Sequence, residues 1–184
     1  MAHINPISTR LKDSTPCTIR TTREEDAAPL YEHLVQVARD GVYIVSEPDE
    51  VAKPEEIRRK IVRHNADPND LNILATLADG TIIGDLLATG GERRRVNHKI
   101  RFGLSVALPY RDKGVGRAMI VALLDWARAH PTIEKIELGV FASNARARHL
   151  YKSLGFVEEG LRKKEIRVAP GRYEDDVAMA LFVK

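Results

Sequence analysis

The sequence contains a single cysteine, Cys17, so no disulfide can form within the chain and no site with several thiolate ligands is possible. Free thiols are typical of a reducing compartment, and we therefore expect a cytoplasmic protein. The sequence also lacks any apolar run near the roughly 20 residues that a membrane-spanning helix needs, so no membrane association is expected. Residues 1–16 have no apolar centre of the kind found in signal peptides, and we expect them to form a polar arm.

Several motifs of common sites are missing as well. There is no His-Glu-x-x-His motif, and the six histidines are scattered, so we expect no metal site. The Gly-x-Ser-x-Gly motif of a nucleophile elbow is also absent. Positive charge gathers at residues 92–99 and 161–164, but no aromatic ladder accompanies it, so nucleic acid is not an expected partner. These segments are solvated surface, or they attract an anionic ligand.

The 184 residues fit one domain, which we place at residues 17–184. Apolar periodicity predicts helices and strands that alternate in the middle of the chain and pair as hairpins at both flanks. Asp79-Gly80 is a favoured pair for a two-residue hairpin turn. The main expected segments are helices at about 54–65, 115–129 and 144–155, a hairpin of two strands at 71–91, and strands at about 99–106, 135–141, 160–168 and 173–182. This pattern indicates an α/β domain with a mixed sheet.

A glycine-containing loop joins the strand at 99–106 to the helix at 115–129. Glycine lets backbone amides approach a ligand, and the free N–H groups of a helix start attract phosphate. A nucleotide-hydrolase loop would need Lys-Ser/Thr after Gly116, where Arg117 and Ala118 stand. A dinucleotide fingerprint would need a third glycine at Met119. Neither of these two phosphate-binding classes fits the sequence.

A second motif, Asn-Ala-Arg-Ala-Arg-His-Leu-Tyr-Lys-Ser-Leu-Gly-Phe, spans residues 144–156. Together with Arg111-x-x-Gly114-x-Gly116, it resembles the signature of the GNAT superfamily of N-acetyltransferases, and the likeness extends over about residues 71–184. The resemblance implies a mixed, mostly antiparallel twisted sheet of about seven strands with about four helices. It also implies that two central strands of this sheet splay apart.

The resemblance implies acetyl-CoA as the co-substrate. Its pyrophosphate would rest on the glycine loop, and its pantetheine arm would run beside the strand that precedes the loop. Asn144 would lie beside the cofactor, cap the helix that follows it, or do both. The residues implied in cofactor binding are Leu104, Val106, Arg111, Asp112, Lys113, Gly114, Val115, Gly116, Asn144 and Tyr151.

The same resemblance implies that Tyr151 is the general acid that protonates the departing thiolate, although a tyrosine on such a helix can also be a core residue. An acceptor amine must lose a proton before it attacks. Many relatives carry Glu or Asp on the strand before the glycine loop, whereas this chain has Arg101 there and no carboxylate from residue 98 to 106. His98 is the tentative base. Asp85, Glu137 or a relay through water are the alternatives.

These expectations combine into an N-acetyltransferase that moves acetyl to a primary amine by direct attack, with a small molecule such as an amino acid as acceptor. The acceptor would lie under the loop at 41–47, near Tyr43 and Glu47. Enzymes that acetylate protein N-termini or polyamines share much of the C-terminal pattern, so they are alternatives, as is a binding module without turnover. The family resemblance also implies a homodimer.

Overall fold

The computed structural model describes residues 3–91 and 93–184. In this part of the chain eight strands form one sheet, and four α-helices flank it. The strands are β1 (Ile7–Arg10), β2 (Pro16–Thr21), β3 (Leu71–Thr76), β4 (Ile82–Gly90), β5 (Lys99–Val106), β6 (Lys135–Phe141), β7 (Val157–Ala169) and β8 (Arg172–Phe182). The helices are α1 (Ala27–Asp40), α2 (Pro54–Ala66), α3 (Val115–Ala129) and α4 (Ala145–Ser153).

The strand order is β1-β2-β3-β4-β5-β6-β8-β7, and every neighbouring pair is antiparallel except β5 and β6. The expected mixed, mostly antiparallel sheet with four helices is therefore confirmed. The strand count is one higher than expected, because β1 lies inside the segment predicted as a polar arm and pairs with β2. Its side chains are largely exposed, so no buried alternation marks it in the sequence.

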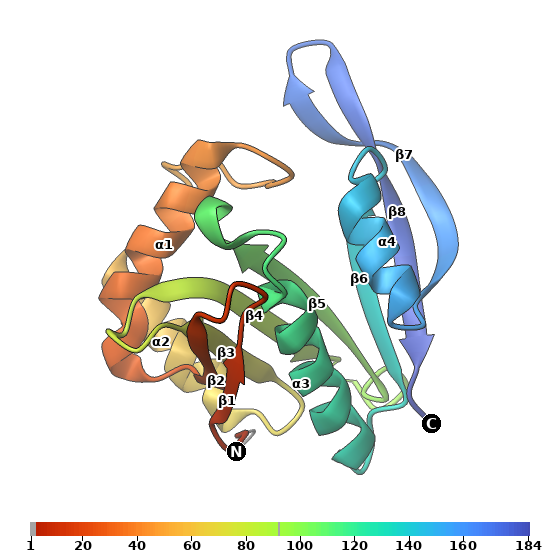
Figure 1. The fold of residues 1–184 in the computed structure, drawn as a ribbon. Coiled ribbons are helices and arrows are strands. Elements are labelled where there is room, and N and C mark those ends of the chain that lie inside the picture. Colours follow the sequence, from red (N-terminus) through yellow and green to blue (C-terminus); the bar gives the residue numbers. More distant parts are fainter. Residues whose placement is uncertain (1–2, 92) are drawn as a thin grey trace.

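The helices cover the two faces of the sheet in pairs (Figure 1). Side chains of α1 and α2 pack with Leu74 and Ile82 in one apolar cluster. Side chains of α3 and α4 pack on the opposite face, in a larger cluster that includes Met119, Leu123 and Tyr151. Helix α3 has the predicted bounds because its apolar side chains repeat at helical spacing and become fully buried. No helix within the described residues is long and apolar enough to cross a membrane.

Strands β5 and β6 pair at one end and then separate. Their backbones are in register from Lys99↔Lys135 to Arg101↔Glu137. Beyond these residues β5 stays paired with β4 and β6 stays paired with β8, so the sheet opens between them (Figure 1). The expected splay of two central strands is thereby confirmed.

The turn between β3 and β4 differs from the two-residue turn that the sequence suggested. Leu77 N donates to Thr81 O at 2.9 Å, which closes a loop of three residues between them. Gly80 has φ +88, the left-handed conformation that a three-residue hairpin loop requires at this position. The Asp79-Gly80 pair thus marks the turn correctly but not its length.

A partly buried ion pair fixes the start of α1. The guanidinium of Arg20 donates two hydrogen bonds of 2.7 Å to the carboxylate of Asp26. The same carboxylate accepts a 2.7 Å hydrogen bond from the backbone amide of Arg23. Because the carboxylate joins β2 to the first turn of the helix, it sets the position of α1 over the sheet.

We expect Asp26→Asn to lower the free energy of unfolding at pH 7 by about 1 to 3 kcal/mol. Burial acts to raise the pKa of Asp26, but hydrogen bonds from Arg20 and Arg23 hold it below its usual value. A lowered folded-state pKa gives stability above the unfolded-state pKa, and this stability is lost as pH falls through the folded-state pKa. As pH falls below about 5, the free energy of unfolding should therefore decrease less in the variant than in the parent. Urea unfolding at several pH values measures this difference.

Glu25→Gln is the matched control, because Glu25 is 70% exposed and its ion pair with Arg23 is 3.7 Å long. It should change the free energy of unfolding by less than about 1 kcal/mol. Identical pH dependence in Asp26→Asn and the parent protein would contradict the assignment.

Candidate active site

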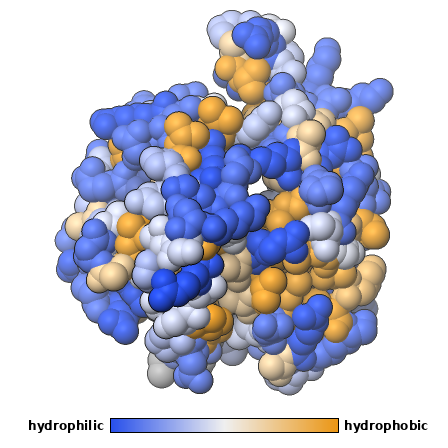
Figure 2. All heavy atoms as spheres, viewed as in Figure 1, coloured by the Kyte–Doolittle hydropathy of each residue, from blue (hydrophilic) through white to orange (hydrophobic). Residues whose placement is uncertain are grey.

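A cavity of about 1090 Å³ lies where β5 and β6 separate. Its walls come from α1, the loop between α1 and α2, strands β4 to β8, the glycine loop and α4. The space-filling view shows a hollow between the two parts of the molecule, with hydrophilic residues around it (Figure 2). The cavity reaches both faces of the sheet, so ligands from opposite sides can meet in the opening.

The glycine loop, residues 111–116, borders this cavity at the start of α3. Asp112 and Gly114 have φ of +65 and +96, which turn the chain sharply. Within the described part of the chain, no backbone amide from 112 to 117 donates a hydrogen bond to another residue. Free amides at a helix start form a binding site for a phosphate group.

Five of the six expected residues of this loop line the cavity, and Lys113 does not. The Lys113 ammonium instead pairs with Asp13 at 2.9 Å. The Lys113 carbonyl accepts a 2.9 Å hydrogen bond from the amide of Lys12. The turn between β1 and β2 therefore holds the glycine loop from outside.

Three further residues expected to bind the cofactor, Leu104, Val106 and Asn144, also line the cavity. The Val106 carbonyl accepts a 3.0 Å hydrogen bond from Nε of Arg111, which ties the loop to β5. Oδ1 of Asn144 accepts from the amide of Ala147 at 3.1 Å, so Asn144 is the N-cap of α4. Its side-chain NH₂ group has no partner among the described residues, and it can donate to a ligand.

Tyr151 reaches the cavity from α4 on the face of the sheet that α3 covers. It is 8% exposed, and its ring packs at centroid distances of 6.0 Å from Phe102 and 5.9 Å from Phe156. Burial raises the pKa of Tyr151 to about 12. The phenol therefore keeps its proton at neutral pH, as a general acid must.

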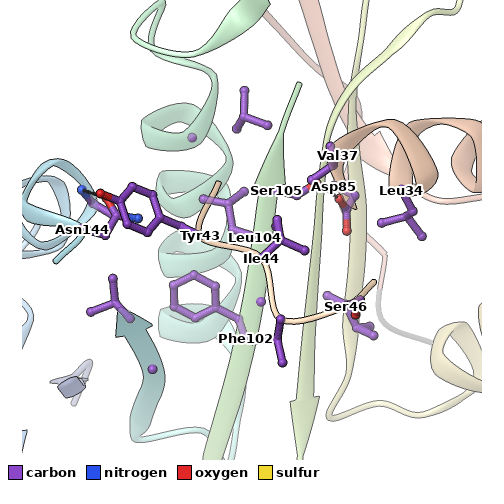
Figure 3. Close-up of a pocket in the computed structure, with 18 of the residues that line it drawn as sticks. Leu34, Val37, Tyr43, Ile44, Ser46, Asp85, Phe102, Leu104, Ser105 and Asn144 are labelled. Atoms are coloured by element: carbon purple, nitrogen blue, oxygen red, sulfur yellow. Dashed lines mark hydrogen bonds between the residues drawn. The ribbon is translucent and has the colours of Figure 1, made fainter. Parts of the chain in front are cut away.

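On the opposite face of the sheet, Asp85 and Ser105 line the cavity (Figure 3), and His33 on α1 contacts both from behind the lining. Asp85 and Ser105 face each other across β4 and β5, and the serine hydroxyl donates to Oδ1 of Asp85. Nε2 of His33 lies 2.9 Å from Oγ of Ser105 and 3.3 Å from Oδ1 of Asp85. The His33 side chain is 3% exposed and that of Asp85 is 20% exposed, so the imidazole positions a carboxylate that remains accessible.

The structure does not bring the two other candidate bases to the cavity. His98 precedes β5, at the end of the strand that remains paired with β6, and it is not among the lining residues. Glu137 is also outside the lining, and Lys99 and Lys135 approach its carboxylate at 3.1 and 3.0 Å. Partial burial acts to raise the pKa of Glu137, but the two lysines hold it below its usual value. Of the carboxylates considered as the general base, Asp85 alone lines the cavity.

The loop between α1 and α2 covers part of the cavity, as expected. Tyr43 lines it, and its hydroxyl donates to the carbonyl of Ser143 at 3.3 Å, next to Asn144 (Figure 3). The Tyr43 ring also packs edge-on against Phe141, with a centroid distance of 5.7 Å. Glu47 is not among the lining residues.

Sequence reasoning missed His33 and Ser105. His33 lies three residues after Leu30 and four before Val37, so it occupies the apolar stripe of α1, and a histidine on such a stripe is a usable signal. Ser105 becomes significant only through its register with Asp85, which depends on the connection at 91–98, where no turn motif fixes the pairing.

Comparisons with known proteins agree with this geometry. The sequence model of the Acetyltransferase (GNAT) family matches residues 36–156. The L-amino acid N-acetyltransferase AaaT of Escherichia coli K12 is 32% identical over 115 residues, which cover 62% of this chain and 70% of that protein. An acetyltransferase of the GNAT family from Streptococcus pneumoniae superposes with a TM-score of 0.86 at 25% identity, covering 91% of this chain and 99% of that one.

A second similar structure is spermidine N-acetyltransferase from Vibrio cholerae in complex with CoA and spermine. Its TM-score is 0.74 at 26% identity, and the match covers 90% of this chain and 95% of that one. The chain therefore belongs to the GNAT family, and it is an acetyltransferase.

We expect Gly116→Val to weaken the binding of coenzyme A by at least about tenfold. A Cβ at Gly116 would already lie 3.4 Å from Leu104 and 3.7 Å from Leu150, so the larger side chain must occupy space between β5 and α4. Isothermal titration calorimetry measures the affinity, and thermal unfolding measures the cost to the fold. Gly116 is a cleaner test than Gly114, whose φ of +96 penalises any side chain.

Gly160→Val on β7 is the control, because a Cβ there meets no heavy atom within 4 Å. This variant should bind coenzyme A as the parent does. Undiminished affinity in a folded Gly116→Val protein would show that the cofactor does not pass between β5 and α4.

Proposed function

We propose that the protein transfers the acetyl group of acetyl-CoA to the primary amine of a small molecule, with amino acids as the leading acceptors. The observation that carries this proposal is the separation of β5 from β6 beyond Arg101 and Glu137. The opening joins the free amides of the glycine loop on one face of the sheet to the accessible carboxylate of Asp85 on the other. A cofactor and an acceptor can thus reach the same point from opposite sides.

The residues at the opening fit coenzyme A. Amides of residues 112–117 bind the pyrophosphate, and Arg111 adds positive charge beside them. The edge of β5 at Leu104 and Val106 faces the gap and guides the pantetheine arm. The free NH₂ group of Asn144 donates to the cofactor from the other side.

The acid and the base lie on opposite faces of the opening, as direct attack requires. Asp85, held by Ser105 and His33, attracts the acceptor ammonium and accepts the proton that the amine loses. The amine nitrogen forms a bond to the acetyl carbon, and a backbone amide of β5 near Val106 stabilises the oxyanion of the tetrahedral intermediate. As this intermediate collapses, the bond from carbon to sulfur breaks and Tyr151 gives its proton to the departing thiolate. The second proton that the nitrogen loses returns to the Tyr151 phenolate.

A covalent route through cysteine has no support. Cys17 is 4% exposed on β2 and does not line the cavity. Burial raises the pKa of its thiol, which disfavours the thiolate needed for attack. We therefore infer that the acetyl group moves without an acyl-enzyme.

Two similar proteins support a small amine as acceptor, since one is named an L-amino acid acetyltransferase and the other a spermidine acetyltransferase. The cavity under the loop of Tyr43 has room for such a molecule. We further propose that the protein acts in the cytoplasm as a homodimer, on the basis of its free thiol and its family.

The direct test is release of coenzyme A thiol when the protein meets acetyl-CoA and a panel of amino acids, polyamines and peptides. We expect thiol release with amino acids, and a mass increase of one acetyl group on the acceptor. Tyr151→Phe should lower kcat by about 100-fold and leave the affinity for coenzyme A unchanged. Binding of acetyl-CoA without turnover of any amine would show that the protein is a binding module instead.

A second prediction concerns Asp85. We expect Asp85→Asn to lower kcat/KM by about 100-fold near neutral pH, because the acceptor ammonium loses its proton acceptor. The loss should shrink as pH rises, since more acceptor then arrives unprotonated. Initial rates measured across a pH series test both statements.

Asp125→Asn, on the exposed face of α3, serves as the control and should leave kcat/KM unchanged. If Asp85→Asn matches the parent at every pH, the base has been assigned to the wrong residue.

A further inference from the structure

Two glycines form the floor of the cavity on the face that carries Asp85. Gly103 lies two residues before Ser105 on the same face of β5, and a Cβ there would meet no heavy atom within 4 Å. Gly139 on β6 lines the cavity on the other side of the opening. Neither position adds a side chain to the space near Asp85, so an acceptor can occupy it.

The guanidinium of Arg101 reaches into this space. Arg101 is opposite Glu137 on β6, yet its Nη2 lies 2.8 Å from the position that a Cβ of Gly139 would take. Gly139 is two residues further along β6, and β5 and β6 run parallel, so the side chain leans toward the Ser105 end of the cavity. A side chain at position 139 would collide with the guanidinium, so glycine keeps this place open.

The guanidinium of Arg101 makes no direct ion pair, although the carboxylate oxygens of Asp176 lie at the same 2.8 Å from the position of a Gly139 Cβ. Arg101 is exposed, and no hydrogen bond or ion pair joins its guanidinium to another described residue. The two carboxylates nearest to it already have cations. Lys99 and Lys135 bind Glu137, and Arg162 binds Asp176, which is buried beside Gly139. The cavity is thus lined both by a positive group without a direct ion pair and by the carboxylate of Asp85.

We propose that Arg101 binds the carboxylate of the acceptor while Asp85 and Ser105 receive its amine, so that the site selects α-amino acids. The proposal rests on the acetyltransferase function proposed above. An arginine binds a carboxylate through two parallel hydrogen bonds, which fixes the orientation of the acceptor as well as its position. A polyamine offers only positive groups, and Arg101 repels them. Arg101 is therefore a specificity-determining residue at the position where relatives often carry an acidic group.

Matched acceptors isolate the role of the carboxylate. L-leucine, L-leucinamide and 3-methylbutylamine share one side chain, but the second has a neutral amide and the third has no carboxyl group. We expect kcat/KM for L-leucine to exceed the value for either analogue by about 10- to 100-fold. Spermidine should be the poorest acceptor in the series.

Arg101→Gln should abolish this preference. Its kcat/KM for L-leucine should fall by about 10- to 100-fold, chiefly through KM, whereas the value for 3-methylbutylamine should not fall. Arg101→Lys should restore part of the activity toward L-leucine, because it keeps the charge without the paired donors. Arg94→Gln, at an exposed position outside the cavity, is the control for loss of a surface charge.

The outcomes separate this inference from the function on which it rests. If thiol is released but L-leucine and its analogues react equally well, or if Arg101→Gln loses activity toward all three alike, Arg101 does not bind a carboxylate. Retained affinity of Arg101→Gln for coenzyme A shows that the variant is folded. If no amine releases thiol from the parent protein, the proposed function itself is wrong.

Discussion

The site of this protein depends on the point at which β5 and β6 stop pairing through backbone hydrogen bonds. Parallel strands normally continue their pairing, since an unpaired strand edge leaves donors and acceptors unsatisfied. Here pairing ends at Arg101 and Glu137, while the outer neighbours β4 and β8 hold each strand in place. The edge that is left open offers backbone groups to an extended ligand, as an exposed sheet edge does in peptide recognition.

The opening also separates two kinds of chemistry. The face covered by α3 and α4 supplies free amides, the capping Asn144 and the buried phenol of Tyr151. The face covered by α1 supplies a carboxylate held by His33 and Ser105, and an arginine without a partner. In the function proposed above, an anionic cofactor and a charged acceptor would enter by different routes and meet where the two strands part.

Local sequence signals predicted the bounds of α3, because its apolar periodicity depends on nearby residues only. The glycine loop, Asn144 and Tyr151 were expected at the site because their motifs resemble those of the GNAT superfamily, and all three border the cavity. The rest of the site depends on packing between distant segments. His33 contacts Ser105 because α1 crosses the sheet at that point. His98 was a candidate base from sequence because the sequence does not indicate which end of β5 separates from β6; the structure shows that the end next to His98 stays paired. Register and helix placement are long-range properties, so a linear pattern does not encode them directly.

A crystal structure of the protein with bound coenzyme A would show directly whether the opening between β5 and β6 holds the cofactor. We expect the pyrophosphate on the amides of residues 112–117, the pantetheine arm along the edge of β5, and the sulfur in the opening between Tyr151 and Asp85. Coenzyme A bound elsewhere, or a sulfur that does not enter the space between β5 and β6, would contradict this expectation.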